Sequence, residues 1–299
     1  MPNVPIHLAN TGSTSSVLRG QLLLSTLRYQ EGKFSNSRGQ NLFYLAAFPN
    51  ESSDKRSGVR AVVLFLHALG DHCRRYSFLY ELLCEQGFGV IAYDFISHGA
   101  SDSENHVRAH TNRFRHFVDD TNDFVTFAKT TILPEMKQSS APIVVTAYSY
   151  GTLVAALSGL RSTLFPKAHI VPAIKRHWLC RDPGYFEDFD NDPLTTNTQK
   201  ITARMGSETL RAMRALAMDT RVGRPDSTFN QIPALFLIGS ADRVVCQRKG
   251  TRFFSRLASR DKEVKVFHGL YHCLLEDPER EDVLRHLMQW LEQRFPDRE

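Results

Sequence analysis

The residues with the clearest chemical potential form one short stretch, Ala147-Tyr148-Ser149-Tyr150-Gly151. Small residues stand two positions before and two positions after the serine, between an apolar run and a helix-forming run. A sharp strand-to-helix turn needs small residues there, because larger side chains would collide, and it projects the serine hydroxyl away from the sheet. Ser149 is therefore the candidate nucleophile, and a serine that caps a helix is the alternative.

A serine hydroxyl is a weak nucleophile at neutral pH, so it needs a base within hydrogen-bond reach and an acid that holds the base in one tautomer. In a strand–turn–helix arrangement of this kind, both partners follow the serine in chain order, in loops at strand ends. Asp242 follows the apolar run ALFLIG, and His272 follows VKVF. This order predicts a Ser149–His272–Asp242 triad for acyl transfer, in preference to a surface aspartate and a structural histidine.

Acyl transfer also needs backbone N–H groups that face the oxygen on which negative charge develops. The turn His67-Ala68-Leu69-Gly70 closes an apolar run, which is where one such donor belongs. Leu69 and Tyr150, the residue after the nucleophile, are the predicted oxyanion donors. The His67 ring is expected to hydrogen-bond locally and to shape the turn, with no part in proton transfer.

Neither a metal ion nor a cofactor is predicted. His106 and His110 have i, i+4 spacing, but no glutamate or third ligand accompanies them. The five cysteines are an odd number without a C-x-x-C pair, so they are interpreted as free thiols in a reducing compartment: Cys73, Cys84, Cys180, Cys246 and Cys273.

Composition limits the class of protein. With 42% hydrophobic and 23% charged residues among 299, the chain can build a large core, which excludes general disorder. The net charge of +5 comes with no nucleic-acid-binding motif, so no nucleic-acid partner is predicted. The sequence shows neither a signal peptide nor the roughly 18 apolar residues of a membrane span, so a soluble, cytoplasmic protein is expected.

The elements that position these residues alternate between strands and helices. Strands are predicted at 28–34, 41–48, 60–66, 88–94, 142–147, 233–238 and 263–267. Helices are predicted at 76–86, 114–132 and 247–259, with a final helix that begins at Asp277-Pro278. This alternation indicates an α/β fold with a mostly parallel central sheet flanked by helices.

Four segments are expected along the chain. Residues 1–25 form a flexible tail, 26–160 the first part of the α/β core, 161–230 a helical cap insertion and 231–299 the rest of the core. Residues 161–181 carry Arg161, Lys167, Lys175, Arg176 and Arg181 among apolar side chains, without an acidic residue. Such a segment can lie on a membrane surface or can pack as a cap element, and both interpretations stay open.

These stretches resemble the α/β-hydrolase fold and, within it, the monoacylglycerol lipase and lysophospholipase group of serine aminopeptidase-like proteins. The matching stretches are HALGDHCRRY, YDFISHGASD, AYSYG, NDPL, GSADRVV and GLYHCLLED, and the resemblance runs from about Arg28 to Arg294. It implies the same nucleophile, acid and base, the same oxyanion donors, and structural loop roles for His98 and Asp102.

The sequence departs from the family pattern in two ways. Ala68 and Ala147 replace glycines, and Thr152 replaces another frequent glycine. The stretch of sequence between Gly151 and Asp192-Pro193 is also shorter than in the family. The sixth strand of the family is therefore missing unless Ala168–Ile174 supplies it. A missing strand would force 233–238 either to pair directly with 142–147 or to leave a gap beside the nucleophile strand. We expect that 168–174 fills the space and that the triad is retained.

The leading hypothesis is a serine hydrolase that cleaves carboxylic esters of single-acyl-chain lipids, monoacylglycerols or lysophospholipids, through an acyl-enzyme. A peptidase or a thioesterase on the same fold is an alternative that the triad does not exclude. A catalytically inactive isoform or interaction protein is the alternative from another class, because of the shortened middle. The possible partners are thus a small lipid ester and, through the cap, a membrane surface.

Overall fold

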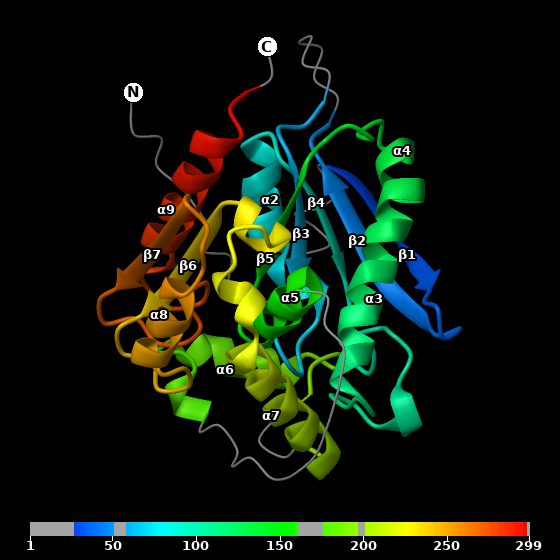
Figure 1. Ribbon diagram of the computed structural model, residues 1–299. Coiled ribbons are helices and arrows are strands. Elements are labelled where there is room, and N and C mark those ends of the chain that lie inside the picture. Colours follow the sequence, from blue (N-terminus) through cyan, green and yellow to red (C-terminus); the bar gives the residue numbers. More distant parts are fainter. Residues whose placement is uncertain (1–26, 51–57, 161–175, 197–200, 298–299) are drawn as a thin grey trace.

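The computed structural model describes residues 27–50, 58–160, 176–196 and 201–297 (Figure 1). Its larger sheet has the strand order β1-β2-β4-β3-β5. The first two strands form an antiparallel hairpin, β2 is antiparallel to β4, and β4, β3 and β5 run parallel. The bounds are Arg28–Ser35 for β1, Asn41–Phe48 for β2, Val62–Leu66 for β3, Gly89–Tyr93 for β4 and Ile143–Ala147 for β5.

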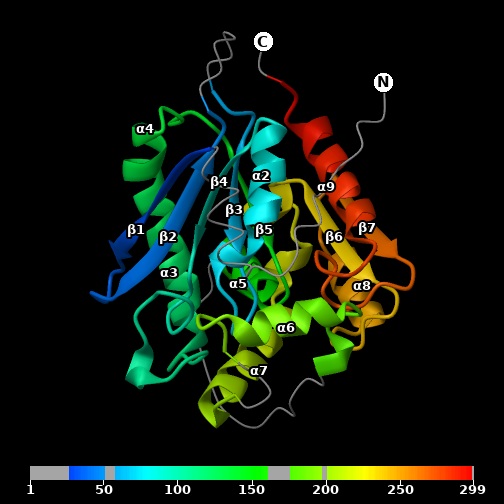
Figure 2. The same cartoon turned by 180° about the vertical axis from the view of Figure 1, so that it is seen from behind.

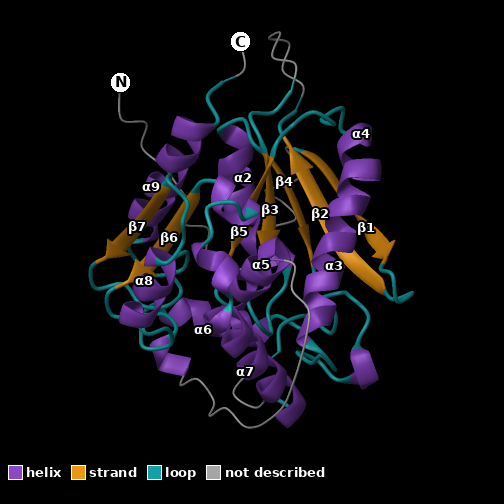
Figure 3. Cartoon of the chain, viewed as in Figure 1, coloured by secondary structure: helices purple, strands orange, loops and turns teal. Residues whose placement is uncertain are grey.

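A second, smaller sheet pairs β6 (Ala234–Gly239) with β7 (Lys262–Phe267) in parallel. Within the described ranges no strand pairing joins β6 to β5, and the two sheets stand apart in Figure 3. Val145 in the middle of β5 is 51% exposed. Of the two arrangements predicted for a missing strand, direct pairing is therefore not the one observed. The segment 168–174 lies outside the described residues, so its strand stays a prediction.

Helices cover both faces of the larger sheet (Figures 1 and 2). One apolar cluster packs α2 and α9 against it, and a second packs α3 and α5 on the opposite face. The cap contributes α6 and α7, and α8 packs on β6. The helix bounds are Ser77–Glu85 for α2, Phe114–Phe127 for α3, Leu133–Glu135 for α4, Tyr150–Leu160 for α5, Pro183–Asn191 for α6, Ala203–Met218 for α7, Gln247–Ser255 for α8 and Arg280–Arg294 for α9.

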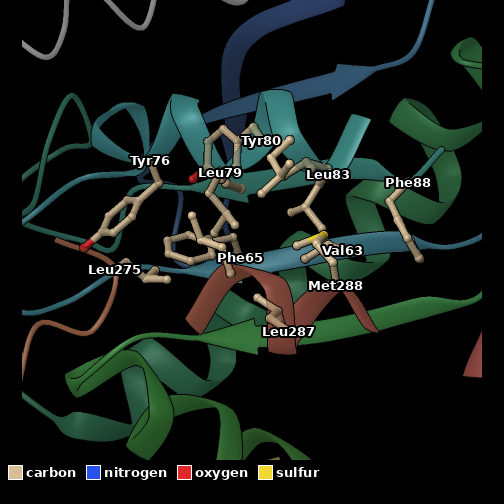
Figure 4. Packing of buried hydrophobic residues seen from close by; sticks show 14 of the residues in the cluster. Val63, Phe65, Tyr76, Leu79, Tyr80, Leu83, Phe88, Leu275, Leu287 and Met288 are labelled. Atoms are coloured by element: carbon tan, nitrogen blue, oxygen red, sulfur yellow. The ribbon is translucent and has the colours of Figure 1, made fainter. Parts of the chain in front are cut away.

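The central strands read as apolar runs because both of their faces are buried. In β3, Val63 and Phe65 face the cluster that contains α2 and α9, whereas Val62, Leu64 and Leu66 face the opposite cluster. Figure 4 shows the first cluster, in which Val63 and Phe65 lie among side chains of α2 and α9. The alternation fixes the register of β3, because a shift by one residue would exchange its two faces.

The start of the last helix differs from the prediction. Asp277 and Pro278 were expected at its N-terminus, but α9 begins at Arg280, with Glu279 as the residue before it. The Asp277 carboxylate is instead fully buried and accepts hydrogen bonds from the amides of Tyr271 and Arg181. A carboxylate that accepts hydrogen bonds from two amides elsewhere is not available to cap a helix.

The segments 26–160, 161–230 and 231–299 remain an expectation about domain organisation, and 1–26 and 161–175 lie outside the described residues. None of the helices in the described ranges is long and apolar enough to cross a membrane.

Candidate active site

Ser149 occupies a strained turn between β5 and α5. Its φ of 49° lies in the left-handed region that residues with a Cβ rarely adopt. A Cβ added at Gly151 would lie 2.4 Å from the carbonyl oxygen of Leu66 and 2.8 Å from that of His67, so only glycine fits where α5 starts beside β3. Ala147 and Thr152 are accommodated in place of the family's glycines. The turn thus aims the serine hydroxyl away from the sheet.

The structure brings the three predicted side chains into one hydrogen-bonded chain. The Ser149 Oγ lies 2.7 Å from Nε2 of His272, and Nδ1 of the same ring lies 2.9 Å from Oδ2 of Asp242. A neutral imidazole protonated on Nδ1 can donate to Asp242 and accept from the serine hydroxyl at the same time. This is the geometry that general-base activation of a hydroxyl requires.

The surroundings of Asp242 keep its carboxylate charged. Burial alone would raise its pKa, but the hydrogen bonds from His272 and from the amides of Val245 and Val244 hold that pKa below its usual value. Those amides lie 2.9 and 2.7 Å from Oδ1, which leaves Oδ2 for the imidazole. At neutral pH, Asp242 can therefore fix one tautomer of His272 and stabilise the imidazolium.

The loops that carry acid and base lie directly against each other. A Cβ added at Gly239, the last residue of β6, would lie 2.2 Å from the carbonyl oxygen of Leu270 and 2.5 Å from that of Tyr271. The Ala241 amide donates to the carbonyl of Leu270 at 3.0 Å. Gly239 thus permits the backbone contact that sets the distance between Asp242 and His272.

Further contacts fix the base loop. The Tyr148 hydroxyl donates to Oε2 of Glu276 at 2.6 Å, which joins the residue before the nucleophile to the loop of His272. The Cys273 amide donates to the Leu179 carbonyl at 2.7 Å, and Asp277 holds the neighbouring amides. Sequence reasoning missed the positioning roles of Tyr148, Glu276 and Asp277. The only sequence signal was their proximity to Ser149 and His272 in the quoted motifs.

The predicted oxyanion donors flank the serine at the two expected positions. Tyr150 is the first residue of α5, so its amide has no acceptor one turn earlier in that helix. Leu69 lies in a turn that the Asp71 amide closes on the Ala68 carbonyl at 3.3 Å, with Gly70 at φ 75°. Their role as donors remains a proposal.

His67 shapes this turn, as expected. Its Nδ1 lies 2.7 Å from the Ala68 carbonyl oxygen, and the Phe95 amide donates to its Nε2 at 3.0 Å. Burial lowers the pKa of His67, so the ring stays neutral and holds the ends of β3 and β4 together.

The loop of His98 and Asp102 is held by its own backbone and side-chain contacts. The Ser97 amide donates to the Asp102 carbonyl, and the Asn41 amide donates to the Asp102 carboxylate, both at 2.8 Å. His98 is buried and its Nδ1 lies 2.8 Å from the Ile96 carbonyl oxygen. These contacts agree with structural roles for both residues.

A buried hydrogen bond connects the cap to the loop after β3. Nε2 of His72 lies 2.9 Å from Oδ2 of Asp192, with both side chains fully buried. Arg75 lies 3.2 Å from Asp71 and 3.3 Å from Asp188 of α6. The stretch NDPL therefore fixes α6 beside the turn of Leu69.

Within the described ranges no group of three or more His, Cys, Asp or Glu side chains could hold a metal ion. His110 is within 2.8 Å of the Thr202 hydroxyl at Nδ1, at the start of α7. The five cysteines are free thiols, and Cys246 is the exposed one. Burial raises the pKa of Cys273 well above its usual value, so the thiol next to the base is unreactive.

The fold and the site define an α/β-hydrolase. The family model described as serine aminopeptidase, S33, matches residues 57–163 and 140–279, and the chain belongs to this family. Solved structures support the fold. The chain is similar to a soluble variant of monoglyceride lipase from Saccharomyces cerevisiae, with a TM-score of 0.73, 16% identity, and coverage of 92% of this chain and 98% of that one.

Curated relatives cover most of the chain. It is 23% identical to phospholipase YtpA of Bacillus subtilis over 251 residues, which are 75% of this chain and 92% of the relative. It is 25% identical to human monoglyceride lipase over 273 residues, which are 79% and 83% of the two chains. The expected fold and the resemblance to the monoacylglycerol lipase group are confirmed, and the chain is a hydrolase of the lipase and esterase type.

Proposed function

We propose that this protein hydrolyses the carboxylic ester bond of single-acyl-chain lipids such as monoacylglycerols, with Ser149 as nucleophile, His272 as base and Asp242 as acid. The observation that carries the proposal is the continuous hydrogen-bonded chain from the serine hydroxyl to the aspartate, with 2.7 and 2.9 Å between partners. The preference for a lipid ester is supported by the relatives named monoglyceride lipase and phospholipase.

The reaction follows from the geometry. His272 Nε2 takes the proton of the Ser149 hydroxyl as Oγ attacks the ester carbonyl, and the carbonyl oxygen becomes negative. The amides of Leu69 and Tyr150 stabilise that charge, and such a donor contributes about 10²- to 10³-fold in rate. The intermediate collapses, His272 protonates the departing alcohol, and an acyl-enzyme remains.

Deacylation repeats the sequence with water. His272 takes a proton from a water molecule that attacks the acyl carbonyl, and returns that proton to Ser149 Oγ when the fatty acid leaves. Asp242 stays ionised throughout and stabilises the imidazolium at both stages.

Labelling with a fluorophosphonate probe tests the nucleophile, because the probe reacts with activated serines. We expect the protein to be labelled and the Ser149→Ala variant to be unlabelled, with an unchanged circular dichroism spectrum. If the folded wild-type protein does not react with the probe, the hypothesis of an inactive interaction protein replaces the proposed enzyme.

Three substrates of matched size separate the alternatives on this fold. We expect turnover of a monoacylglycerol to exceed turnover of the corresponding acyl thioester and of an aminoacyl anilide. A dominant anilide activity would assign the protein as a peptidase, and a dominant thioester activity as a thioesterase.

A further inference from the structure

The outward face of α8 is cationic and apolar, and it lies next to the candidate active site. From Arg243 to Arg260 the chain has six arginine or lysine residues and neither aspartate nor glutamate. Asp242, whose carboxylate accepts from the amides of Val244 and Val245, immediately precedes this stretch. Any partner bound on α8 is therefore close to the acid of the site.

The opposite face of α8 is already used in the core. Phe254 is buried and stacks on Phe236 of β6, with ring centroids 5.6 Å apart. The helical spacing then places Arg248, Lys249 and Arg252 on the outside, where all three are exposed. Side-chain packing thus leaves only the cationic face of this helix for a partner.

The positive charges of these three residues do not stabilise one another in the folded protein. No ion pair joins any of them to a carboxylate in the part of the chain that the structure describes, and like charges at i, i+4 spacing destabilise a helix. Arg256, at the end of α8, is instead engaged, because it donates to the carbonyls of Ala217 and Asp219 at 2.7 and 3.1 Å.

Exposed apolar side chains border this cationic face. Val245, just before α8, is 39% exposed. The contacts of Arg256 place the end of α8 against the end of α7, where Met218 is 81% exposed and Met213 is 54% exposed. In Figure 1, α7 and α8 lie at the same end of the molecule as the cap helix α6. Cations combined with protruding apolar side chains are typical of surfaces that bind lipid headgroups.

The predicted membrane segment of the cap contrasts with α8. Arg176 is within 2.7 Å of Asp190, and Arg181 is paired with Asp277 and Glu279. The remaining basic residues of 161–181 lie outside the described residues. Arg248, Lys249 and Arg252 of α8, in contrast, are exposed and have no such carboxylate partner among the described residues.

We propose that the face formed by Arg248, Lys249 and Arg252, with Val245 and Met218 beside it, docks the protein on an anionic phospholipid surface. The inference rests on the proposed function, because an amphiphilic ester resides in such a surface and must reach Ser149 from it. Charge complementarity selects the occupant: the cations attract anionic headgroups, and the apolar side chains enter the interface.

Vesicle binding of the Ser149→Ala variant tests docking separately from catalysis. We expect it to bind vesicles of phosphatidylcholine with phosphatidylserine, and to bind vesicles of phosphatidylcholine alone far more weakly. Raising the ionic strength from about 0.05 to 0.5 M should weaken the binding, because the Debye length shortens. Equal binding to both kinds of vesicle, or none to either, would overturn the proposal.

A charge-neutralised variant locates the surface. The triple change Arg248→Gln, Lys249→Gln and Arg252→Gln should weaken vesicle partitioning by on the order of a hundredfold at low salt. The matched control, Lys33→Gln, Arg115→Gln and Lys129→Gln, removes the same charge from exposed residues of β1 and the α3 region and should bind as the parent does. Equal losses in both variants would assign the attraction to net charge and reject a docking face.

Two activity measurements complete the experiment, on triple variants that retain Ser149. Turnover of a short water-soluble ester should be the same in both triple variants, which also verifies folding. Hydrolysis of monoacylglycerol in anionic vesicles should fall in the α8 variant alone. Vesicle binding without any ester hydrolysis would reject the proposed function and leave docking intact. Tighter binding to a DNA duplex than to vesicles would overturn docking in favour of a nucleic-acid partner.

Discussion

Ser149 stands on a five-stranded sheet, whereas Asp242 and His272 follow the strands of a two-stranded one. The strands β3 and β4 are buried along their full length, but most residues of β6 and β7 keep some exposed surface. The first half positions Ser149 at the end of β5, a partly exposed strand that is paired along its length with the buried strand β3. The second half positions its two residues by loop contacts, because strand pairing does not join it to β5 within the described ranges.

The base loop supplies these contacts. Leu270, Leu274 and Leu275 pack in the apolar cluster of the larger sheet, and in Figure 4 Leu275 lies near Tyr76 and Phe65. The bond from Tyr148 to Glu276 crosses between the halves on the side of the nucleophile. A triad can therefore keep its geometry across an interrupted sheet when one loop is anchored in both parts.

The largest expected effect follows from the chemical role of the smaller half. Asp242→Asn should lower kcat by about 10⁴-fold, because the amide stabilises the wrong tautomer of His272. Steady-state kinetics on a short ester measures it. Asp226→Asn, at an exposed ion pair with Arg224, is the control and should keep full activity. A kcat for Asp242→Asn within tenfold of the wild type would remove Asp242 from the triad.

A backbone contact between the acid and base loops should be the next most sensitive point. Gly239→Ala introduces a Cβ within 2.2 Å of the Leu270 carbonyl oxygen, so the loops must separate. We expect a loss of about 2–3 kcal/mol in the free energy of unfolding and a lower kcat. Gly223→Ala is the control, since its Cβ would meet the nearest atom at 3.5 Å. Chemical denaturation compares the two, and equal stabilities would contradict the close contact.

The hydrogen bond that links the two halves can be removed by deleting one oxygen atom. Tyr148→Phe removes the hydroxyl that donates to Glu276 and leaves a partly buried carboxylate with fewer donors, which should destabilise the protein by about 1–2 kcal/mol. We also expect kcat on a short ester to fall several-fold, since the base loop loses a contact beside Ser149.

Tyr44→Phe provides the comparison for this variant, because its hydroxyl accepts from Gln30 in the hairpin of β1 and β2. A loss of stability with unchanged kcat in Tyr148→Phe would show that the bond between the halves does not position His272.

The last expected effect depends on pH and leaves catalysis aside. Burial raises the pKa of Glu276 to about 7, while the hydrogen bond from Tyr148 opposes that rise. Between its ordinary pKa and about 7, the folded protein keeps a proton that the unfolded chain releases, so stability falls as the pH rises. Glu276→Gln cannot ionise. From pH 5 to pH 8, the unfolding free energy of the variant should therefore increase relative to that of the wild type by on the order of 2 kcal/mol. A difference that does not vary with pH would reject the raised pKa.

Local sequence determined the parts of this protein that depend on neighbouring residues. The small residues around Ser149 predicted a sharp turn, and the structure has Ser149 at a φ of 49° between β5 and α5. The apolar runs predicted the strands because a strand buried on both faces must be apolar throughout. The placement of Ser149, Asp242 and His272 was also readable from sequence, since each residue lies in the loop or turn that follows an apolar strand.

Contacts between distant residues were decided by the tertiary structure. Asp277 has the sequence signature of a helix start, yet its buried carboxylate accepts hydrogen bonds from the amides of Tyr271 and Arg181 instead. The pairing of Tyr148 with Glu276 spans 128 residues, and no periodicity encodes it. The separation of β6 from β5 likewise depends on which segments meet in space. A sequence pattern records the local environment of a residue, and only folding selects its distant partner.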